Sequence, residues 1–385
     1  MYTHPTTTQR SIPQAPRTRT RPSVRSEDVL STDACIVGTA TGLAPHHYDQ
    51  QQLAALASQF LPAGSHREGT IERFFARVGV QERYLALPVE RYRALHGLGE
   101  RNDAWIAAAT ELGEGVVRRL LDESGVRADE ISLLVTTTVT GIAVPSLDAR
   151  LMNRLPFRRS LKRMPLFGLG CLGGAAGLAR VADYLRGAPT EAAILLSVEL
   201  CSLTFQPHDG STANIVSTGL FGDGASAVLL VGAQHPLASR GLGPRIIDAR
   251  SAFFPDSERV MGWDVIDSGF RVVLGPDVAD VVAKHVPPAL DALLADHHLV
   301  RDDIAAWIVH PGGPKVIDAI TKCLGLSESA LEPTRACLRR VGNLSSSSVL
   351  FLLDERRRHP PAEGARGLLM AMGPAFCAEM VLLSW

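Results

Sequence analysis

The chain has 385 residues, with 39 Lys or Arg against 40 Asp or Glu and a formal net charge of −1. This balance argues against the basic surface that binds nucleic acid, and no apolar run reaches the roughly 18 to 20 residues of a membrane span or forms the core of a secretory signal. We therefore expect a cytoplasmic protein that acts on small molecules, long enough for two domains or one large duplicated domain.

Residues 1–28 are rich in Thr, Pro and Arg, carry almost no large apolar side chain and contain no acidic residue before Glu27. Such a segment cannot bury enough apolar surface to fold, so we predict a disordered leader. An organelle transit peptide is also rich in Arg and poor in acids, but it has an amphipathic period that is missing here.

From residue 34 onwards, short apolar runs alternate with longer helical patterns. We predict a strand over Cys35–Val37, a helix over Asp103–Ser124 and a strand over Ile131–Thr138. Alternation of this kind is typical of α/β proteins.

The sequence also contains an internal repeat. The segment from Leu121 is echoed by the segment from Leu294: in each, a helical pattern ends, a short turn with Arg and two acids follows, and an apolar strand begins. The strands start at Ile131 and Ile304, which are 173 residues apart. We predict a duplicated fold with two halves related by a pseudo-twofold axis, placed at residues 29–235 and 236–385.

The same offset brings Cys171 close to Asn343. Both follow small residues and precede a helical pattern, so two equivalent helix starts would face one site. His310, at the end of the apolar strand W-I-V-H, corresponds to Thr137 in the first copy. The repeat therefore predicts that Cys171, His310 and Asn343 share one site.

Cys171 is the candidate nucleophile. The six cysteines, at positions 35, 171, 201, 323, 337 and 377, have no C-x-x-C spacing, so we expect free thiols rather than a zinc site or disulfides. Most free cysteines are small buried hydrophobes. Cys171 differs because it follows a strand-like run and begins a helix, whose N-terminal N–H groups should lower the pKa of the thiol.

His310 and Asn343 supply the other polar groups. A histidine at a strand end is often only a satisfied polar group, and an asparagine at a helix start is often a plain N-cap. Beside a thiol, however, an imidazole can take its proton, and two aimed N–H donors can stabilise the enolate oxygen of a decarboxylating malonyl thioester. This chemistry needs no metal.

Taken together, the motifs resemble those of the chalcone synthase family, the type III polyketide synthases, in their bacterial form. The resemblance covers residues 34 to 385 and implies a thiolase-type α-β-α-β-α fold and a homodimer. It is carried by G-C-L-G-G at Cys171, G-L-F-G-D-G-A-S-A at 219–227, H-P-G-G-P-K at 310–315, G-N-L-S-S at 342–346 and M-G-P-A-F-C-A-E-M-V-L-L at 372–383.

The resemblance implies a role for each of the three residues. Cys171 would receive an acyl group from its coenzyme A thioester, with His310 activating the thiol. Asn343 and His310 would assist decarboxylation of malonyl-CoA, and the carbanion would attack the Cys171 thioester in a Claisen condensation. Malonyl-CoA and an acyl-CoA starter would be the substrates, and no cofactor would be needed.

The resemblance also implies residues around the cavity. Phe221 matches the gatekeeper phenylalanine, with core packing as the alternative, and Val144 matches a residue that reaches across the dimer. Val272 stands where plant enzymes have a second gatekeeper phenylalanine and Trp263 where they have glycine. Further cavity positions are Cys201, Thr204, Ser217 and Ser345. Arg73, Arg77 and Lys315 match the tunnel mouth, where they would meet coenzyme A phosphates; a solvated face explains them nearly as well.

Two other classes of protein fit the sequence less well. A ketoacyl-carrier-protein synthase of the starter type also uses Cys, His and Asn, but around other motifs. A non-catalytic dimeric scaffold would not need all three residues. Within the favoured family, Val272 and the low aromatic content favour a fatty acyl-CoA starter and an alkylresorcinol or alkylpyrone product. A malonyl-only enzyme of the tetrahydroxynaphthalene type is the alternative.

Overall fold

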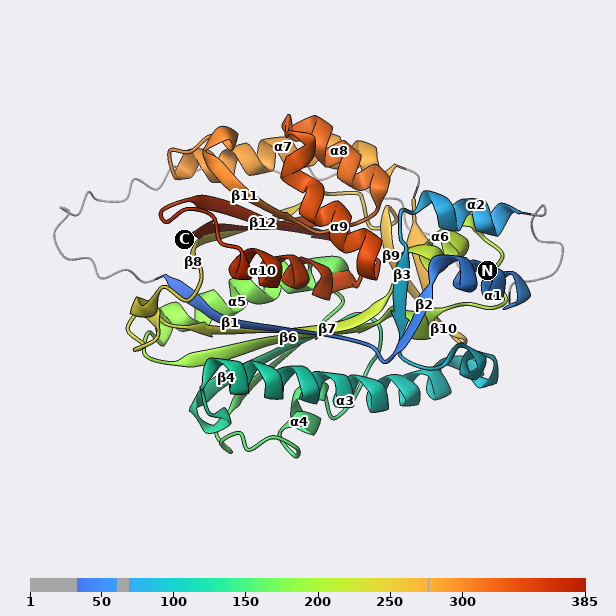
Figure 1. Ribbon diagram of the computed structural model, residues 1–385, viewed down its shortest axis with the longest axis horizontal. Coiled ribbons are helices and arrows are strands. Elements are labelled where there is room, and N and C mark those ends of the chain that lie inside the picture. The colour runs from blue at the N-terminus through green and yellow to red at the C-terminus, as the bar shows by residue number, and fades with distance from the viewer. Residues whose placement is uncertain (1–32, 61–68, 276) are drawn as a thin grey trace, which may run out of the picture. The chain divides into compact units, whose positions relative to one another are not determined.

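The computed structural model describes residues 33–60, 69–275 and 277–385. The leader predicted for residues 1–28 lies outside these ranges. The described chain is built around nine hydrogen-bonded strands in the order β11-β12-β13-β8-β1-β7-β6-β4-β5, shown in Figure 1. Among the described residues, no helix is both long and apolar enough to cross a membrane.

Five of these strands form what we call the N-terminal half-sheet. Its central strands are mostly apolar, and β6 and β7 are buried along their whole length, which is typical of a sheet covered on both faces. β6 runs parallel to β4 and antiparallel to β7. In spatial order the strands are β1 (Ala34–Leu43), β7 (Asp223–Val231), β6 (Ala192–Leu200), β4 (Ile131–Thr138) and β5 (Lys162–Phe167).

The other four strands form the C-terminal half-sheet, which repeats this topology. β12 runs parallel to β11 and antiparallel to β13, as β6 does to β4 and β7. The two half-sheets join where β8 pairs with β1 over two residues of each strand. The strands are β8 (Arg245–Phe253), β13 (Cys377–Ser384), β12 (Arg366–Gly373) and β11 (Ile304–Val309).

The predicted duplication is confirmed by the repeated turn. β4 begins at Ile131 and β11 at Ile304, each after a single 3-10 turn, η2 (Ala128–Glu130) and η6 (Arg301–Asp303). In both turns the final acid accepts a hydrogen bond from the backbone N–H three residues earlier, at 2.8 Å. The predicted strand at 35–37 lies within β1 and the predicted helix at 103–124 within α3. The division at residue 235 stays a prediction.

Helices form the layers on either side of the strands. α5 (Gly173–Gly187) and α10 (Ser348–Arg358) contact each other between the half-sheets, and α3 (Gly97–Ser124) and α4 (Leu147–Leu151) cover the outer face of the N-terminal half-sheet (Figure 1). α7 (Val278–Asp296) and α8 (Pro314–Leu324) pack on the C-terminal one through a separate apolar cluster. These five layers are the α-β-α-β-α order expected of a thiolase-type fold.

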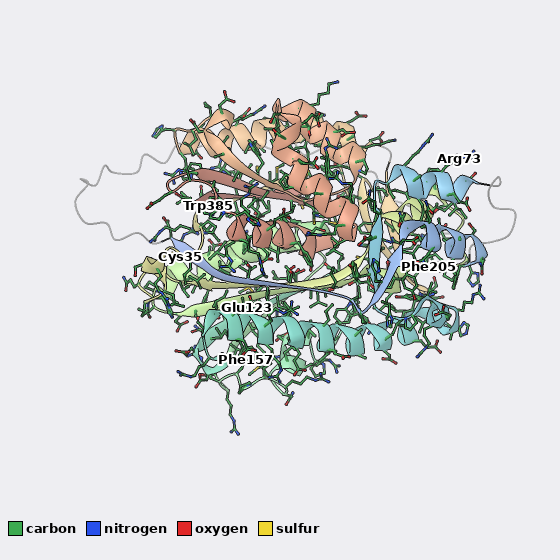
Figure 2. The ribbon with its side chains drawn as sticks, in the orientation of Figure 1. Cys35, Arg73, Glu123, Phe157, Phe205 and Trp385 are labelled. Carbon is green, nitrogen blue, oxygen red and sulfur yellow. The ribbon has the colours of Figure 1, made fainter. Side chains whose placement is uncertain are left out.

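Smaller elements gather at one end of the N-terminal half-sheet, at the right of Figure 1. The elements are β2 (His46–Asp49), α1 (Gln50–Phe60), α2 (Thr70–Arg77), β3 (Glu82–Leu85), η1 (Val89–Ala94), η4 (Cys201–Thr204), α6 (Thr212–Leu220), β9 (Met261–Ile266), β10 (Gly269–Leu274) and α9 (Glu332–Val341). α1 and α2 pack against α6 in this region, and α9 contacts β3. The side chain of Arg73, on α2, points away from this region in Figure 2.

Candidate active site

The two equivalent helix starts meet at the centre of the molecule. Cys171 lies in η3 (Gly170–Leu172), which leads into α5, and η3 contacts η8 (Ser345–Ser347), which leads into α10. The Sγ atom of Cys171 is 3.6 Å from the Oγ atom of Ser345. The offset of the repeat therefore predicted correctly that these two segments face each other.

Glycine makes this close approach possible. Gly170 has φ +53°, and a Cβ atom there would lie 2.4 Å from Pro374 Cδ. On α5, a Cβ atom at Gly174 would lie 2.2 Å from the carbonyl oxygen of Ser346. Both positions need glycine, the first for its backbone conformation as well as for space. The G-C-L-G-G motif thus sets the place of Cys171.

Burial controls the charge of Cys171. The thiol is almost fully buried, and this burial raises its pKa to about 12; the nearby Glu199 carboxylate raises the pKa further, while the hydrogen bond to Ser345 opposes the shift. The expectation of a lowered pKa at a helix N-terminus was therefore wrong, because the cost of desolvating a thiolate exceeds the stabilisation by the helix start. The thiol needs a base to lose its proton.

His310 can be that base. It follows β11, and its backbone N–H donates to the Met370 carbonyl of β12 at 2.9 Å. Its side chain is only 2% exposed, and neither ring nitrogen has a hydrogen-bond partner among the residues that the structure describes. Burial lowers the pKa of His310 to about 3, so the imidazole is neutral. A buried polar ring without a partner is costly and is typical of a group that awaits a substrate.

The backbone around Asn343 fixes its side chain. Its N–H donates to the Leu220 carbonyl at 2.9 Å, and its carbonyl accepts from Gly222 N–H at 3.0 Å. Its Oδ1 atom accepts from the Ser345 N–H at 2.8 Å, as an N-cap would. Because the amide oxygen is used in this way, the amide NH₂ group remains to donate to a ligand. Capping and ligand binding are thus compatible at Asn343.

Sequence reasoning missed Glu199, which lies beside this site. Its carboxylate is fully buried and accepts hydrogen bonds from Val139 N–H at 3.1 Å, from the Thr140 hydroxyl at 3.0 Å and from the Ser346 hydroxyl. Burial raises the pKa of Glu199 to about 7. A single acid near the end of the apolar strand A-A-I-L-L-S-V-E-L was a signal for such a buried carboxyl.

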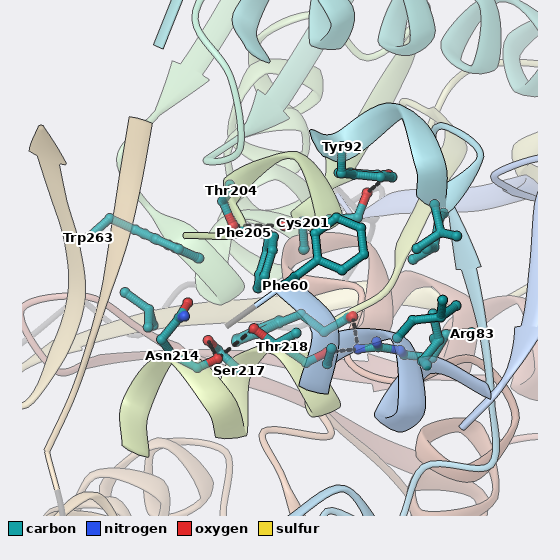
Figure 3. A pocket seen from close by; sticks show the side chains of 18 residues that line it. Phe60, Arg83, Tyr92, Cys201, Thr204, Phe205, Asn214, Ser217, Thr218 and Trp263 are labelled. Atoms are coloured by element: carbon teal, nitrogen blue, oxygen red, sulfur yellow. Dashed lines mark hydrogen bonds between the residues drawn. The ribbon is translucent and has the colours of Figure 1, made fainter. Parts of the chain in front are cut away.

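A pocket lies next to these residues, between α1, α6, η4 and the β9–β10 hairpin (Figure 3). The rings of Phe221 and Trp263 are 6.2 Å apart, and Phe221 pairs with Asn343 through a backbone bridge, so the pocket reaches the site at Phe221. Six residues of the predicted cavity line it: Cys201, Thr204, Ser217, Phe221, Trp263 and Val272.

Other predicted residues lie elsewhere. Cys171, His310, Asn343 and Ser345 are not among the residues that line this pocket. Val144 is 92% exposed. Their roles stay predictions.

The predicted coenzyme A cations are on the surface. Arg73, Arg77 and Lys315 are all exposed, and the guanidinium of Arg73 donates to the Thr70 hydroxyl at 3.0 Å. A Cβ atom at Gly79, just after α2, would lie 3.4 Å from Pro314 at the start of α8, so Arg77 and Lys315 belong to neighbouring segments. Their role in phosphate binding stays a prediction.

The sequences of both halves of the chain match domains of one protein family. The N-terminal domain of the chalcone and stilbene synthases matches residues 69–235, and the C-terminal domain matches residues 245–384. The chain belongs to this family. It is a chalcone synthase-like type III polyketide synthase, and therefore an acyltransferase. The match favours this family over the ketoacyl-carrier-protein synthases.

Individual members of the family are similar over nearly the whole chain. The 1,3,6,8-tetrahydroxynaphthalene synthase of Streptomyces peucetius subsp. caesius is 46% identical over 379 residues, which are 97% of this chain and 100% of that protein. The crystal structure of the 1,3,6,8-tetrahydroxynaphthalene synthase from Streptomyces coelicolor A3(2) matches with a TM-score of 0.84 and 29% identity, over 92% of this chain and 99% of that one. PKS-I from the brown alga Ectocarpus siliculosus matches with a TM-score of 0.86 and 27% identity, over 94% and 100%.

Proposed function

We propose that this type III polyketide synthase uses malonyl-CoA as both starter and extender and makes a tetrahydroxynaphthalene, with Cys171, His310 and Asn343 as its catalytic residues. The 46% identity with a 1,3,6,8-tetrahydroxynaphthalene synthase over the full length of that protein carries the choice of product. The pocket supports it through its polar wall, because a poly-β-ketone is rich in oxygen atoms. Hydroxyl and amide groups of this wall come from Ser202, Thr204, Asn214, Ser217 and Thr218.

The first step loads Cys171. The neutral imidazole of His310 takes the thiol proton, which gives a thiolate and an imidazolium that stabilise each other. The thiolate attacks the thioester carbonyl of the starter, and the departing coenzyme A thiolate takes the proton from His310. Because its pKa is lowered, the ring of His310 is neutral before this step, and the thiolate beside it stabilises the imidazolium once the proton has moved.

The second step extends the chain. A malonyl-CoA loses carbon dioxide, and the charge that develops on its thioester oxygen is stabilised by N–H donors of His310 and Asn343. The ring nitrogens of His310, which have no partner in the described part of the chain, and the amide NH₂ of Asn343, whose oxygen already accepts from Ser345, suit this role. The carbanion attacks the Cys171 thioester, the Cys171 thiolate leaves, and the chain on coenzyme A is longer by two carbons.

A fatty acyl-CoA starter with an alkylresorcinol or alkylpyrone product is the second candidate. One side of the pocket is apolar, formed by Leu53, Leu56 and Phe60 of α1 together with Val89. Such a wall suits an alkyl tail, since apolar surface gains by leaving water.

A homodimer completes the proposal. The strand β5 lies at the open edge of the sheet, where unpaired backbone groups can bind a second strand. Three apolar side chains are exposed on β5 or in the loop that follows β4: Ile142 at 42%, Val144 at 92% and Phe167 at 51%. A second copy of the chain would cover them. The cytoplasmic location expected from the sequence remains a prediction.

Incubation of the purified full chain with malonyl-CoA alone, and then with added fatty acyl-CoA starters, tests the proposal by product mass. We expect a naphthalene product from malonyl-CoA alone, no product from Cys171→Ala, and full activity from Cys337→Ala, a control at another buried cysteine. Products that carry an alkyl tail would establish the second candidate instead. A Cys171→Ala enzyme that still extends chains would contradict the role of Cys171.

A further inference from the structure

Three polar side chains form a hydrogen-bonded chain in the wall of the pocket. The hydroxyls of Tyr92, on η1, and Ser202, on η4, are 2.5 Å apart. The Ser202 hydroxyl also contacts the carboxylate of Asp223, at the start of β7. Tyr92 and Ser202 line the pocket, whereas Asp223 is fully buried behind them. Figure 3 shows the Tyr92 ring at the edge of the pocket.

The hydrogen bonds of this chain have a single direction. Because a carboxylate only accepts, Ser202 donates to Asp223, and Tyr92 must then donate to Ser202. The Tyr92 oxygen also accepts from the backbone N–H of Leu87 at 3.2 Å, which leaves it one lone pair. In this state Tyr92 can accept a proton from a ligand and cannot offer its own.

Asp223, at the end of this hydrogen-bonded chain, is suited to act as a base. The Asp223 carboxylate accepts from the backbone N–H groups of Ala86 at 2.6 Å and Ser202 at 2.8 Å, which fix its position. Burial raises the pKa of Asp223 to about 6, against the nearby positive charge of Arg83. A general base works best when its pKa is close to the working pH, so burial makes Asp223 a better base than an exposed aspartate.

We propose that Tyr92 accepts a proton from the poly-β-ketone chain during ring closure, and that Ser202 passes a proton on to the buried carboxylate of Asp223. Tyr92 is then a catalytic residue, and Ser202 and Asp223 act through it. The proposal rests on the proposed function, since only a chain with carbonyl groups at alternate carbons has protons acidic enough for such a relay.

The proton transfer balances without another reactant. A C–H bond between two carbonyls breaks, and its electron pair stays on the chain as an enolate. The proton goes to Tyr92, the Tyr92 proton to Ser202 and the Ser202 proton to Asp223, so both hydroxyls are restored. The enolate then attacks a carbonyl of the same chain, and the new alkoxide takes a proton back along the same path.

Tyr92→Phe tests the relay because it removes only the hydroxyl. Chains that fail to close a carbocycle can still release a lactone, so the measurement is the ratio of aromatic to lactone products made from malonyl-CoA, with coenzyme A release recorded in parallel. We expect the ratio to fall by at least about tenfold, while coenzyme A release per folded enzyme changes by no more than about twofold. The ratio does not depend on how much of the variant folds.

Three further variants sharpen the test. Ser202→Ala and the double variant should give the same ratio as Tyr92→Phe, because the hydroxyls act in series. Tyr84→Phe, at a partly buried tyrosine on β3 outside the pocket lining, should leave the ratio unchanged. An unchanged ratio in Tyr92→Phe would overturn the relay alone. A wild-type enzyme that makes no aromatic ring would overturn the proposed product together with the relay.

Discussion

The Oγ atom of Ser345 lies 3.6 Å from the Sγ atom of Cys171, although 174 positions separate the two residues in the sequence. Each belongs to the short turn that opens one of the two central helices. The proposed nucleophile therefore comes from one half of the duplicated fold, and the segment with the proposed oxyanion donor Asn343 comes from the other. Neither half contains the whole site.

The contact between α5 and the turn before α10 leaves no room for a methyl group at Gly174. In Gly174→Ala the new Cβ atom would lie 2.2 Å from the carbonyl oxygen of Ser346, so we expect the free energy of unfolding to fall by about 1–3 kcal/mol, measured in urea. Gly115→Ala is the matched control. Gly115 is exposed on α3, and a Cβ atom there would have none of the described non-adjacent residues within 4 Å, so alanine should raise stability by about 0.5–1 kcal/mol. If Gly174→Ala and Gly115→Ala changed the free energy of unfolding equally, the result would argue against close packing at Gly174.

The neutral His310 should make stability depend on pH. Its pKa is lowered to about 3 in the folded protein, against about 6.5 in an unfolded chain. Between these two pH values the unfolded state binds more protons than the folded state. The free energy of unfolding of the protein should therefore fall by about 1.4 kcal/mol for each unit that the pH decreases. His310→Gln should lose this part of the dependence in urea unfolding at several pH values, and His359→Gln, at an exposed position, should keep it. Parallel curves for wild type and His310→Gln would contradict a buried neutral imidazole.

Trp263 should limit the length of the starter. Its ring faces Phe221 across one end of the pocket, so Trp263→Ala should open this end to larger acyl groups. In competition assays we expect the ratio of long-chain to malonyl-primed products to rise by at least about tenfold. Phe253→Ala, which truncates an exposed phenylalanine outside the pocket, serves as the control. A ratio that stays the same in Trp263→Ala would mean that the tail lies elsewhere.

Val144 should contribute to the proposed dimer. The side chain is 92% exposed in the single chain, so Val144→Glu places no strain on the fold itself. In a dimer the new carboxylate would be buried without a partner, and we expect self-association to weaken by at least about a hundredfold, measured by light scattering after size exclusion. Val300→Glu, at another exposed valine, should leave the dimer intact. An unchanged mass for Val144→Glu would move the interface to another face.

Much of the architecture could be read from local signals. The repeated turn before Ile131 and Ile304 predicted the duplication, and G-C-L-G-G and G-N-L-S-S predicted which turns face each other. The pocket lining came from a family resemblance, because Cys201 and Val272 carry no local sign of sharing a wall.

What the sequence could not predict depends on burial and on distant contacts. The raised pKa of Cys171 arises from desolvation, which no motif reports. The relay joins Tyr92 to Asp223 through a serine more than a hundred residues from the tyrosine, and only the folded chain brings them together.

The position of β13 affects how the enzyme is made in the cell. This strand follows all the others in the sequence, yet it lies between β12 and β8 inside the C-terminal half-sheet. During translation the ribosome must deliver residues 377–384 before that half-sheet can close. Until then, the apolar edges of β8 and β12 stay open to other chains, so this is the interval in which a chaperone would have most effect on yield.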